Sequence, residues 1–380
     1  MSRVMSRAMS LSEVMAEAGH EQVFFVADGA SGLRAVIAVH STALGPSLGG
    51  IRFWRYATDR EAFADVLRLS EAMTLKAAVA GLHQGGGKAV VRCDDPDRPR
   101  SESLLRALGR AIHELGGRYL AAEDVGATTR DMDLIARETP WVTGVSEADG
   151  GSGDPSPVTA YGVLCGMRAA ARELWGDPSL AGRDVVVQGV GHVGSHLVRM
   201  LVEEDASVRV ADVHAARVEA LVRECGVTPV AVDRAVIEPC DVLAPCALGA
   251  VITMRSVEQL RCRAVVGAAN NQLAEPAVDD ALAERGVLYA PDFVVNAGGI
   301  INIAEEFVGY DRTRALARTA EIEATTARVF ATARELGLPP GRAAEVMARR
   351  RIEREAVPGG RWQPGDPAPW TGGEASRFQG

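Results

Sequence analysis

The segment that most constrains the fold of this chain is a short apolar run followed at once by three spaced glycines. Asp184 to Gln188 predicts a buried strand, the next six residues read GVGHVG, and a helical pattern runs from Ser195 to Glu204. This order forms the dinucleotide-binding fingerprint, in which Gly189 makes the tight turn, Gly191 lets a pyrophosphate approach the backbone and Gly194 packs helix on strand. The segment therefore predicts a Rossmann-type parallel sheet.

The strand that follows indicates which dinucleotide is bound. Val208 to Ala211 ends in Asp212, about twenty residues beyond the glycines, where a carboxylate binds the adenosine ribose hydroxyls. A 2′-phosphate would be repelled by this charge, so NAD is favoured over NADP, although Arg217 leaves NADP open. His192 is expected to be an exposed residue of the turn and not a catalyst, because the x positions tolerate most side chains.

Three more strands, at 241–244, 264–268 and 287–290, alternate with helices, as a doubly wound parallel sheet requires. The loops after them carry small or amide residues, including Asn270, Asn271 and Asn296. Each asparagine could be an ordinary turn residue. Three such loops at the carboxyl edge of one sheet favour a ligand crevice.

The first half of the chain places two lysines, Lys76 and Lys88, on either side of a glycine triplet in an apolar run. A solvated helix face is the ordinary explanation of lysines, but such faces carry interleaved acids and this run has none. A phosphate-binding P-loop is excluded because Leu82 and Ala89 stand where it needs Gly and Ser or Thr. We expect a cleft in which like-charge repulsion and partial desolvation lower the pKa of both ammonium groups, and in which they bind a carboxylate.

Around these lysines the pattern predicts a small sheet with helices. We expect a hairpin of 22–27 and 34–41, an irregular loop over 44–54, helices over 60–77 and 101–115, and strands at 89–92 and 118–122. Asp124 follows the last strand. It suits a cleft, and equally an N-cap or a turn.

Length and composition set the remaining limits. A chain of 380 residues predicts two domains, and the Gly- and Pro-rich segment 150–157 predicts their boundary. We expect a catalytic domain at 1–150, joined by C-terminal helices at about 331–356, a dinucleotide-binding domain at 151–330 and a disordered tail at 357–380. A net charge of −9 without basic clusters argues against nucleic acid or anionic membrane as partners.

The cysteines and the N-terminus bear on the compartment. The six cysteines form no CxxC pair and no metal-ligand spacing with histidine, so we expect reduced thiols, no metal and a cytoplasmic protein. The N-terminus lacks the long apolar region of a signal peptide, and no apolar run is long enough to cross a bilayer.

These features together predict a reaction. NAD in one domain, with Lys76, Lys88 and Asp124 in the other, indicates hydride transfer on a small carboxylate substrate in the interdomain cleft. Oxidative deamination of an amino acid uses all three side chains, for binding the carboxylate, activating water and moving protons.

Several motifs then identify a family resemblance. LGPSLGGIRF, MTLKAAVAGLHQGGGKAV, AEDVGATTRDMD, APCALGAVI, AANNQLAEP and YAPDFVVNAGGIINIAEE lie between Gln22 and Arg354. With them the chain resembles the amino acid dehydrogenase superfamily of glutamate, leucine, phenylalanine and valine dehydrogenases, and is most similar to the branched-chain members. The resemblance implies an α/β fold of two domains, NAD as cofactor, reversible release of ammonia and a homo-oligomer.

The same resemblance implies roles for single residues. Lys76 would bind the substrate carboxylate with the backbone amides of Gly49 and Gly50, Lys88 would activate water, and Asp124 would exchange protons with the amino group. Cofactor contacts would come from Thr159, Gly189, Val190, Gly191, His192, Val193, Gly194, Ser195, Asp212, Val213, Arg217, Ala247, Leu248, Ala268, Ala269 and Asn270.

Substrate choice follows from the residues matching the pocket, which are Leu48, Ala122, Glu123, Asn270, Ile300 and Ile303. Leu48 stands where glutamate-specific relatives have a lysine, and a buried side-chain carboxylate against leucine would be unpaired. The methyl group of Ala122 narrows the pocket, and the two isoleucines give it a branched aliphatic surface. We expect valine, leucine and isoleucine as substrates; an aromatic amino acid dehydrogenase and a catalytically silent NAD sensor are the alternatives.

Overall fold

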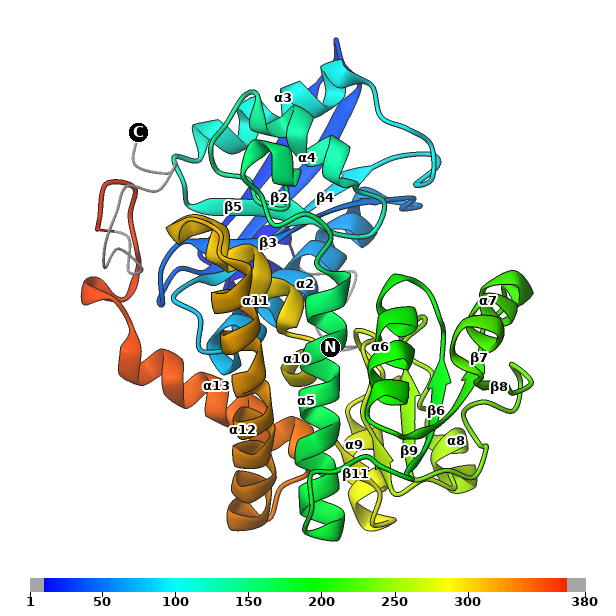
Figure 1. Cartoon of the computed structure of the whole chain (residues 1–380). Helices are drawn as coiled ribbons and strands as arrows, with labels where there is room; N and C mark the ends of the chain where they lie inside the picture. The colour runs from blue at the N-terminus through cyan, green and yellow to red at the C-terminus, as the bar shows by residue number, and fades with distance from the viewer. Residues whose placement is uncertain (1–9, 368–380) are drawn as a thin grey trace. The chain divides into compact units, whose positions relative to one another are not determined.

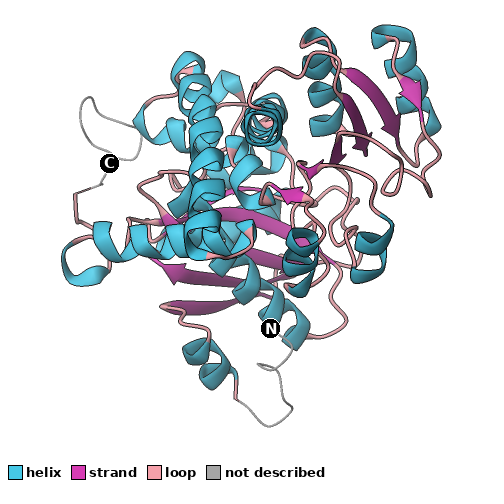
Figure 2. Ribbon diagram, turned by 90° about the horizontal axis from the view of Figure 1, so that it is seen from below, coloured by secondary structure: helices cyan, strands magenta, loops and turns pink. Residues whose placement is uncertain are grey.

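The computed structural model describes residues 10–367 and divides them into two compact units, each with its own sheet (Figures 1 and 2). Unit 1 contains the residues up to Asp154, Ile303–Asp311 and the residues from Arg349 on. Unit 2 contains Pro155–Asn302 and Arg312–Ala348. The change of unit after Asp154 lies within the segment where the sequence predicts a boundary.

Unit 1 is built on a five-stranded sheet of order β1-β2-β4-β3-β5. Its strands are β1 (Gln22–Asp28), β2 (Leu33–Ser41), β3 (Ser47–Trp54), β4 (Gly85–Arg92) and β5 (Tyr119–Glu123). The predicted hairpin is confirmed, since β1 and β2 pair antiparallel, while β3 runs parallel to both β4 and β5. The side chains that follow β5 therefore lie at the same edge as the end of β3.

The prediction of an irregular loop over 44–54 is wrong. Residues Ser47–Trp54 form β3, which lies between β4 and β5. The glycines of this strand serve close packing and not a turn, because a Cβ on Gly49 would lie 1.8 Å from the carbonyl oxygen of Gly87. The predicted strand at 89–92 also begins earlier, at Gly85, so Lys88 lies inside β4.

Helices cover both faces of this sheet (Figure 1). α3 (Glu102–Glu114) and α4 (Thr129–Ala136) pack on one face through a cluster that includes Ile37, Phe53 and Leu108. α1 (Leu11–Glu17) and α2 (Asp59–Val79) pack on the other through Val36, Phe63 and Val90. Alternation of residues along β2 and β4 supplies both cores.

Glycine brings α2 onto the sheet at short range. A Cβ on Gly86 would lie 2.1 Å from the backbone nitrogen of Thr74 and 2.6 Å from the carbonyl oxygen of Ser70. Helix and strand are therefore in backbone contact. Because Lys76 is on α2 and Lys88 on β4, this contact fixes the two segments that carry the lysines.

Unit 2 has a six-stranded sheet of order β11-β10-β9-β6-β7-β8. The strands are β6 (Asp184–Gln188), β7 (Ser207–Ala211), β8 (Thr228–Pro229), β9 (Val242–Pro245), β10 (Ala264–Val265) and β11 (Leu288–Tyr289). All neighbours pair parallel, and the order reverses between β6 and β9. The predicted doubly wound sheet is confirmed, and its ligand crevice is expected at this reversal.

The helices of unit 2 also lie on both faces of its sheet. α5 (Ser156–Trp175), α6 (His192–Glu203) and α12 (Arg312–Leu336) share one core cluster with β6, β7 and β9. α8 (Met254–Gln259) and α9 (Ala277–Glu284) contribute to the other. The remaining helices are α7 (Ala215–Cys225), α10 (Asp292–Val295), α11 (Gly298–Ala304) and α13 (Pro340–Glu355).

The C-terminal part differs from the prediction in two ways. Arg312–Ala348 belongs to unit 2, where α12 packs along α5, so the helices at 331–356 do not join the first domain as a block. The expected disordered tail is ordered at its start, because Trp362 is buried and the Val357 and Trp362 amides donate to the carbonyls of Ala43 and Thr42. The rest of that tail, 368–380, lies outside the described residues. No helix in the described range is long and apolar enough to cross a membrane.

Candidate active site

The centre of the site in unit 1 is a buried ion pair between Lys88 and Asp124. Lys88 lies on β4 and is 4% exposed, and its Nζ is 2.9 Å from Oδ2 of Asp124, the first residue after β5. β3 runs between these two strands, and the residue between the charges is Gly50. A Cβ on Gly50 would lie 2.6 Å from Cβ of Asp124, so a side chain there would separate the pair.

A third charged group, Arg52, completes this centre. Its Nε donates to the same Asp124 Oδ2 at 2.8 Å, and its Nη1 donates to Asp65 Oδ2 on α2 at 3.2 Å. Arg52 lies in the LGPSLGGIRF motif, and the sequence predicted no role for it. The strand period could have revealed this role. Alternate residues of a strand lie on one face, so Arg52 shares the face of Leu48 and Gly50, which were both predicted to belong to the site.

Burial and charge act differently on the two partners. Burial lowers the pKa of Lys88, and Arg52 lowers it further, against the opposing effect of Asp124. Burial would raise the pKa of Asp124, but Lys88 and Arg52 outweigh it and hold this pKa far below its usual range. Asp124 thus stays ionised while Lys88 loses its proton more easily than an exposed lysine. The pKa of Lys88 is lowered as expected, and burial contributes as expected; the repelling cation is Arg52, which was not predicted.

Lys76 lies near the C-terminal end of α2 and is partly buried. α2 packs on the face of the sheet that carries Lys88, since Gly86 and Lys88 are two residues apart on β4 and Gly86 contacts α2. Lys76 and Lys88 are also the two lysines of the whole chain, whose other basic residues are arginines and histidines. That count is a signal that the pattern of single segments does not reveal.

The backbone amides of Gly49 and Gly50, which are expected to bind the substrate carboxylate together with Lys76, lie in β3. The β3–β4 ladder pairs Leu48 with Gly86 and resumes at Ile51 with Ala89, so it is interrupted at Gly49 and Gly50. The hydroxyl of Tyr119 donates to the carbonyl of Gly49 at 2.7 Å and fixes this segment from the opposite face. An interrupted ladder is suited to binding a substrate anion.

The pocket residues of unit 1 separate into two groups. Leu48 and Ala122 are buried, and their strand positions put them on the face of Lys88. Glu123 lies on the other face with Thr129 and Gly144, and burial raises its pKa. The structure therefore places Glu123 on the face of the sheet opposite to the charged centre.

Ile300 and Ile303 lie one turn apart on α11. Residues at this spacing project from the same side of a helix. Ile300 belongs to unit 2 and Ile303 to unit 1, so α11 passes from one unit to the other.

The glycine turn of unit 2 has the geometry that its spacing predicts. Gly189 has φ +95°, and a Cβ on Gly194 would lie 2.0 Å from the carbonyl oxygen of Gly189. At Gly191 a Cβ would meet only Arg217 Nη1, at 3.9 Å, which leaves the backbone open to a ligand. α6 begins at His192, whose side chain is exposed as expected, so its first amides face this open turn. The turn fits a dinucleotide pyrophosphate.

Asp212 fixes the turn as well as following β7. Its Oδ2 accepts a hydrogen bond from the Val190 amide at 2.8 Å, and its Oδ1 accepts one from the His214 amide at 2.8 Å. Each carboxylate oxygen retains acceptor capacity for a ribose hydroxyl. Asp212 thus has a structural contact that the sequence did not predict.

The other loops of unit 2 meet at the carboxyl edge of the sheet. Ala247 packs against Gly189, and the carbonyl oxygen of Asn270 lies close to Gly249. The side-chain amide of Asn296 donates to the Ala268 carbonyl at 3.0 Å and to Asn270 Oδ1 at 2.9 Å. The two loops that carry Asn270 and Asn296 are thereby joined.

The remaining cofactor positions differ in exposure. Thr159 on α5 donates to the Pro155 carbonyl and adjoins Gly299, and Ala269 is buried. Val213 and Leu248 are 77% and 83% exposed, large values for apolar side chains. Exposed apolar residues beside a turn of this kind are available to contact an adenine ring.

Two other features bear on the chemistry. Among the described residues no group of three or more His, Cys, Asp or Glu side chains could hold a metal. The six cysteines are free, and burial raises the pKa of Cys246 and Cys262 to about 12, so these thiols are unreactive.

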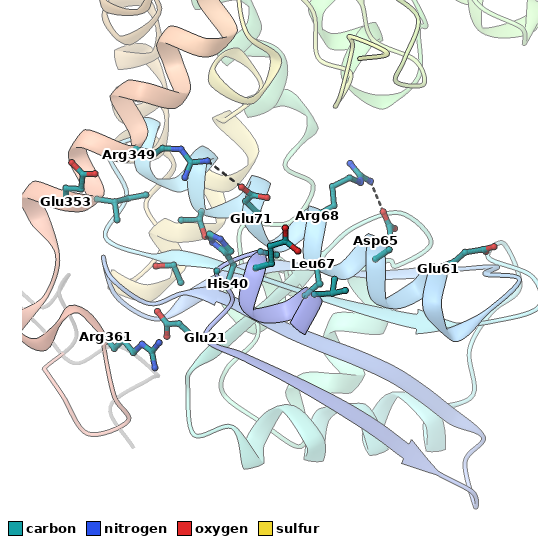
Figure 3. A pocket seen from close by; sticks show the side chains of 18 of the residues that line it. Glu21, His40, Glu61, Asp65, Leu67, Arg68, Glu71, Arg349, Glu353 and Arg361 are labelled. Carbon is teal, nitrogen blue, oxygen red and sulfur yellow. Dashed lines mark hydrogen bonds and ion pairs between the residues drawn. The ribbon is translucent and has the colours of Figure 1, made fainter. Parts of the chain in front are cut away.

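A separate cavity of about 1030 Å³ opens on unit 1 between α1, α2 and α13 (Figure 3). Its described lining includes Asp65 and Arg68, which form an ion pair at 2.7 Å, but neither Lys88 nor Asp124. Asp65 thus contacts Arg52 on one side and this cavity on the other.

A parallel sheet with a dinucleotide turn, and a buried lysine–aspartate pair in the other unit, define a dehydrogenase that uses a nicotinamide dinucleotide. Residues 20–141 match the family model described as Glu/Leu/Phe/Val dehydrogenase, dimerisation domain, and residues 150–220 and 209–353 match that of Glutamate/Leucine/Phenylalanine/Valine dehydrogenase. The chain belongs to the Glu/Leu/Phe/Val dehydrogenase family.

Similar proteins cover nearly the whole chain. A valine dehydrogenase of Streptomyces virginiae is 53% identical over 339 residues, which are 88% of this chain and 94% of that protein. A leucine dehydrogenase of Thermoactinomyces intermedius is 49% identical over 345 residues, or 91% and 94% of the two chains. The crystal structure of an L-tryptophan dehydrogenase from Nostoc punctiforme superposes with a TM-score of 0.80 at 38% identity, covering 90% of this chain and 99% of that one.

Proposed function

We propose that this chain catalyses the NAD-dependent, reversible oxidative deamination of valine, leucine and isoleucine to 2-oxo acids and ammonia. The observation that carries the proposal is the buried Lys88–Asp124 pair, in which one group is easily deprotonated and the other stays ionised. Similarity to valine and leucine dehydrogenases over about nine-tenths of the chain supports the choice of substrate class.

Lys76 and the amides of Gly49 and Gly50 bind the substrate carboxylate in this proposal. An ammonium group and open backbone amides attract the anion and orient the α-carbon. A bound oxidised nicotinamide would supply the hydride acceptor for this carbon. The substrate ammonium group gives a proton to Asp124, and loss of the hydride from the α-carbon leaves an iminium ion.

Lys88 in its neutral form accepts a proton from the water that attacks this iminium carbon. A C–O bond forms, and the positive charge of the iminium is neutralised. Asp124 then returns its proton to the amino group, the C–N bond breaks, ammonia leaves, and the hydroxyl proton passes to Asp124 with formation of the 2-oxo acid. Because the pKa of Asp124 is depressed, its protonated form is short-lived and passes the proton on readily.

The apolar residues favour a branched aliphatic side chain in the substrate. Leu48 is fully buried on the face of Lys88 and offers no partner to a second carboxylate. Ala122 narrows the same face, and Ile300 and Ile303 add branched surface. A difference of one methylene among the three substrates is worth about 1–3 kcal/mol in an apolar pocket, so none of them is excluded sharply.

The choice of NAD over NADP rests on Asp212. A carboxylate accepts hydrogen bonds from ribose hydroxyls and repels a 2′-phosphate. A homo-oligomer in the cytoplasm is also part of the proposal. It is supported by the match of residues 20–141 to a domain described as a dimerisation domain and by the free cysteines.

The direct test is formation of NADH with a panel of amino acids, with NADP as the comparison cofactor. We expect turnover with valine, leucine and isoleucine, and weak activity with glutamate and phenylalanine. A clear preference for phenylalanine or tryptophan would contradict the pocket assignment and favour an aromatic amino acid dehydrogenase. Absence of turnover with every amino acid, with NAD still bound, would favour a sensor.

The proposed role of Lys88 gives a first prediction. Lys88→Ala should lower deamination by at least about 10³-fold while NAD binding, measured by fluorescence titration, stays within a factor of two. Lys88→Arg should be equally inactive although it keeps the charge, because a guanidinium does not lose its proton. Activity retained in Lys88→Arg would refute the role of a proton acceptor.

A further inference from the structure

We propose that Arg52 is a positioning residue of this reaction: it binds one oxygen of Asp124, leaves the other to the substrate, and places its positive charge on the carboxylate that Lys88 also contacts. The inference rests on the proposed function, in which neutral Lys88 is the base. It assigns a role to a side chain that touches neither the carboxylate-binding lysine nor the cofactor turn.

The hydrogen bonds of Asp124 support the claim that Arg52 orients its carboxylate. Lys88 Nζ lies 2.9 Å and Arg52 Nε 2.8 Å from the same atom, Oδ2 of Asp124. Oδ1 of Asp124 accepts no hydrogen bond from the residues that the structure describes. Two donors on one oxygen fix the rotation of the carboxylate, and the second oxygen remains for proton exchange with the amino group.

Arg52 itself is held from its other side. Its Nη1 donates to Asp65 Oδ2 at 3.2 Å, and the same oxygen accepts a hydrogen bond of 2.6 Å from the Tyr56 hydroxyl. Arg68 binds the other oxygen of Asp65 at 2.7 Å. The guanidinium of Arg52 is only 19% exposed and lies between two carboxylates, so its planar donors have a fixed direction.

The positive charge of Arg52 also affects the protonation of Lys88. Arg52 and Lys88 are two cations on one carboxylate, and of the two only Lys88 can lose its proton, because a guanidinium stays charged. The charged groups facing Lys88 are Asp124 after β5, Arg52 on β3 and Asp65 on α2. His40 on the adjacent strand β2 binds Thr74 and is neutral, since burial lowers its pKa to about 3. The positive charge of Arg52 therefore opposes protonation of Lys88.

The test compares Arg52→Gln and Arg52→Lys with Arg55→Gln as a matched control. Arg55 is three residues away on the same segment, is exposed, and forms no ion pair with the described residues. Deamination requires neutral Lys88, so kcat/KM rises with pH up to the pKa of Lys88. In Arg52→Gln this pKa is higher, and the acidic limb of the pH profile should move up by about one pH unit. Arg52→Lys should move it less, and Arg55→Gln should leave it in place.

A second readout needs no turnover. Acetic anhydride labels neutral amines, and because the chain has two lysines, mass spectrometry follows Lys76 and Lys88 separately across pH. The labelling midpoint of Lys88 should rise in Arg52→Gln by the same amount as the kinetic limb, while that of Lys76 stays constant. If Arg52→Gln does not fold, a smaller rise in Arg52→Lys relative to the unmodified chain is the expected result.

The possible results distinguish a failure of the inference about Arg52 from a failure of the proposed function. In Arg52→Gln, kcat could fall while the acidic limb of the pH profile and the labelling midpoint of Lys88 both stay in place. This result would show that Arg52 is merely structural and would overturn the inference. Failure of the unmodified chain to turn over any amino acid would overturn the proposed function alone, because the labelling midpoint still measures the effect of Arg52 on Lys88.

Discussion

At the scale of single residues, the site depends on the difference between lysine and arginine. Arginine supplies a permanent positive charge, as in the pair of Arg52 with Asp124. The two lysines are both at the proposed site. A lysine can lose its proton when buried, and an arginine does not, which explains why position 88 is not an arginine.

Asp124→Asn tests the electrostatics of this centre. It should lower deamination by about 10²-fold or more, and it should lower the free energy of unfolding at neutral pH by about 3 kcal/mol, because Lys88 and Arg52 lose a shared partner. The native pKa of Asp124 is depressed, so its stabilisation is present above the ordinary pKa of about 4 and is lost as the pH falls below it.

Urea unfolding of both proteins at several pH values measures this difference. The gap between the original chain and Asp124→Asn should be constant from pH 7 to 5 and should shrink below about pH 4. A gap that does not depend on pH would show that Asp124 stabilises the fold by packing and not by charge.

At the scale of elements, the sequence predicted the helices of unit 1 well and its central strand poorly. The helices over 60–77 and 101–115 show apolar spacing with Thr58 and Ser101 as N-caps, which are local signals. β3 contains Gly49 and Gly50, and glycine disfavours strands unless close backbone packing requires it. That packing, against β4 and Asp124, is a tertiary property that no local window contains.

Gly86→Ala tests the backbone contact between β4 and α2. The new methyl group would lie 2.1 Å from the Thr74 nitrogen, so α2 must move away from the sheet. We expect a loss of stability of about 1–3 kcal/mol and a rise in KM for the amino acid, since Lys76 moves with α2. Gly29→Ala, in the open hairpin turn, is the matched control and should change neither.

Thermal unfolding and steady-state kinetics of these two variants give the answer. A Gly86→Ala enzyme with reduced stability and an unchanged KM would mean that α2 accommodates the methyl group without displacing Lys76.

At the scale of the molecule, the alternation of strands and helices predicted the parallel sheet of unit 2, and the change of composition at 150–157 predicted one boundary. The returns of the chain to unit 1 at Ile303–Asp311 and from Arg349 were not predicted. They occur within the helices α11 and α13, so no turn residue marks them. Likewise, the Gly- and Pro-rich composition after Glu355 suggested disorder, while the burial of Trp362 depends on distant partners.

Trp362→Ala tests that contact. Trp362 is 6% exposed, and its backbone amide donates to the carbonyl of Thr42, the first residue after β2. Loss of the indole should destabilise unit 1 by about 3 kcal/mol and leave NAD affinity unchanged, because the cofactor turn lies in unit 2. The exposed neighbour Arg361 provides the control, Arg361→Ala. Calorimetry and a cofactor titration measure both effects, and equal stability of the two variants would contradict the docking of this segment.

The scarcity of lysine has a practical consequence for proteolysis. A protease that cuts only after lysine has two possible sites in this chain, one on α2 and one inside β4. The folded backbone protects both, so cleavage requires local opening of the segments that hold the site. The rate of cutting by such a protease therefore reports the opening of this one region, free of background from the remainder of the molecule.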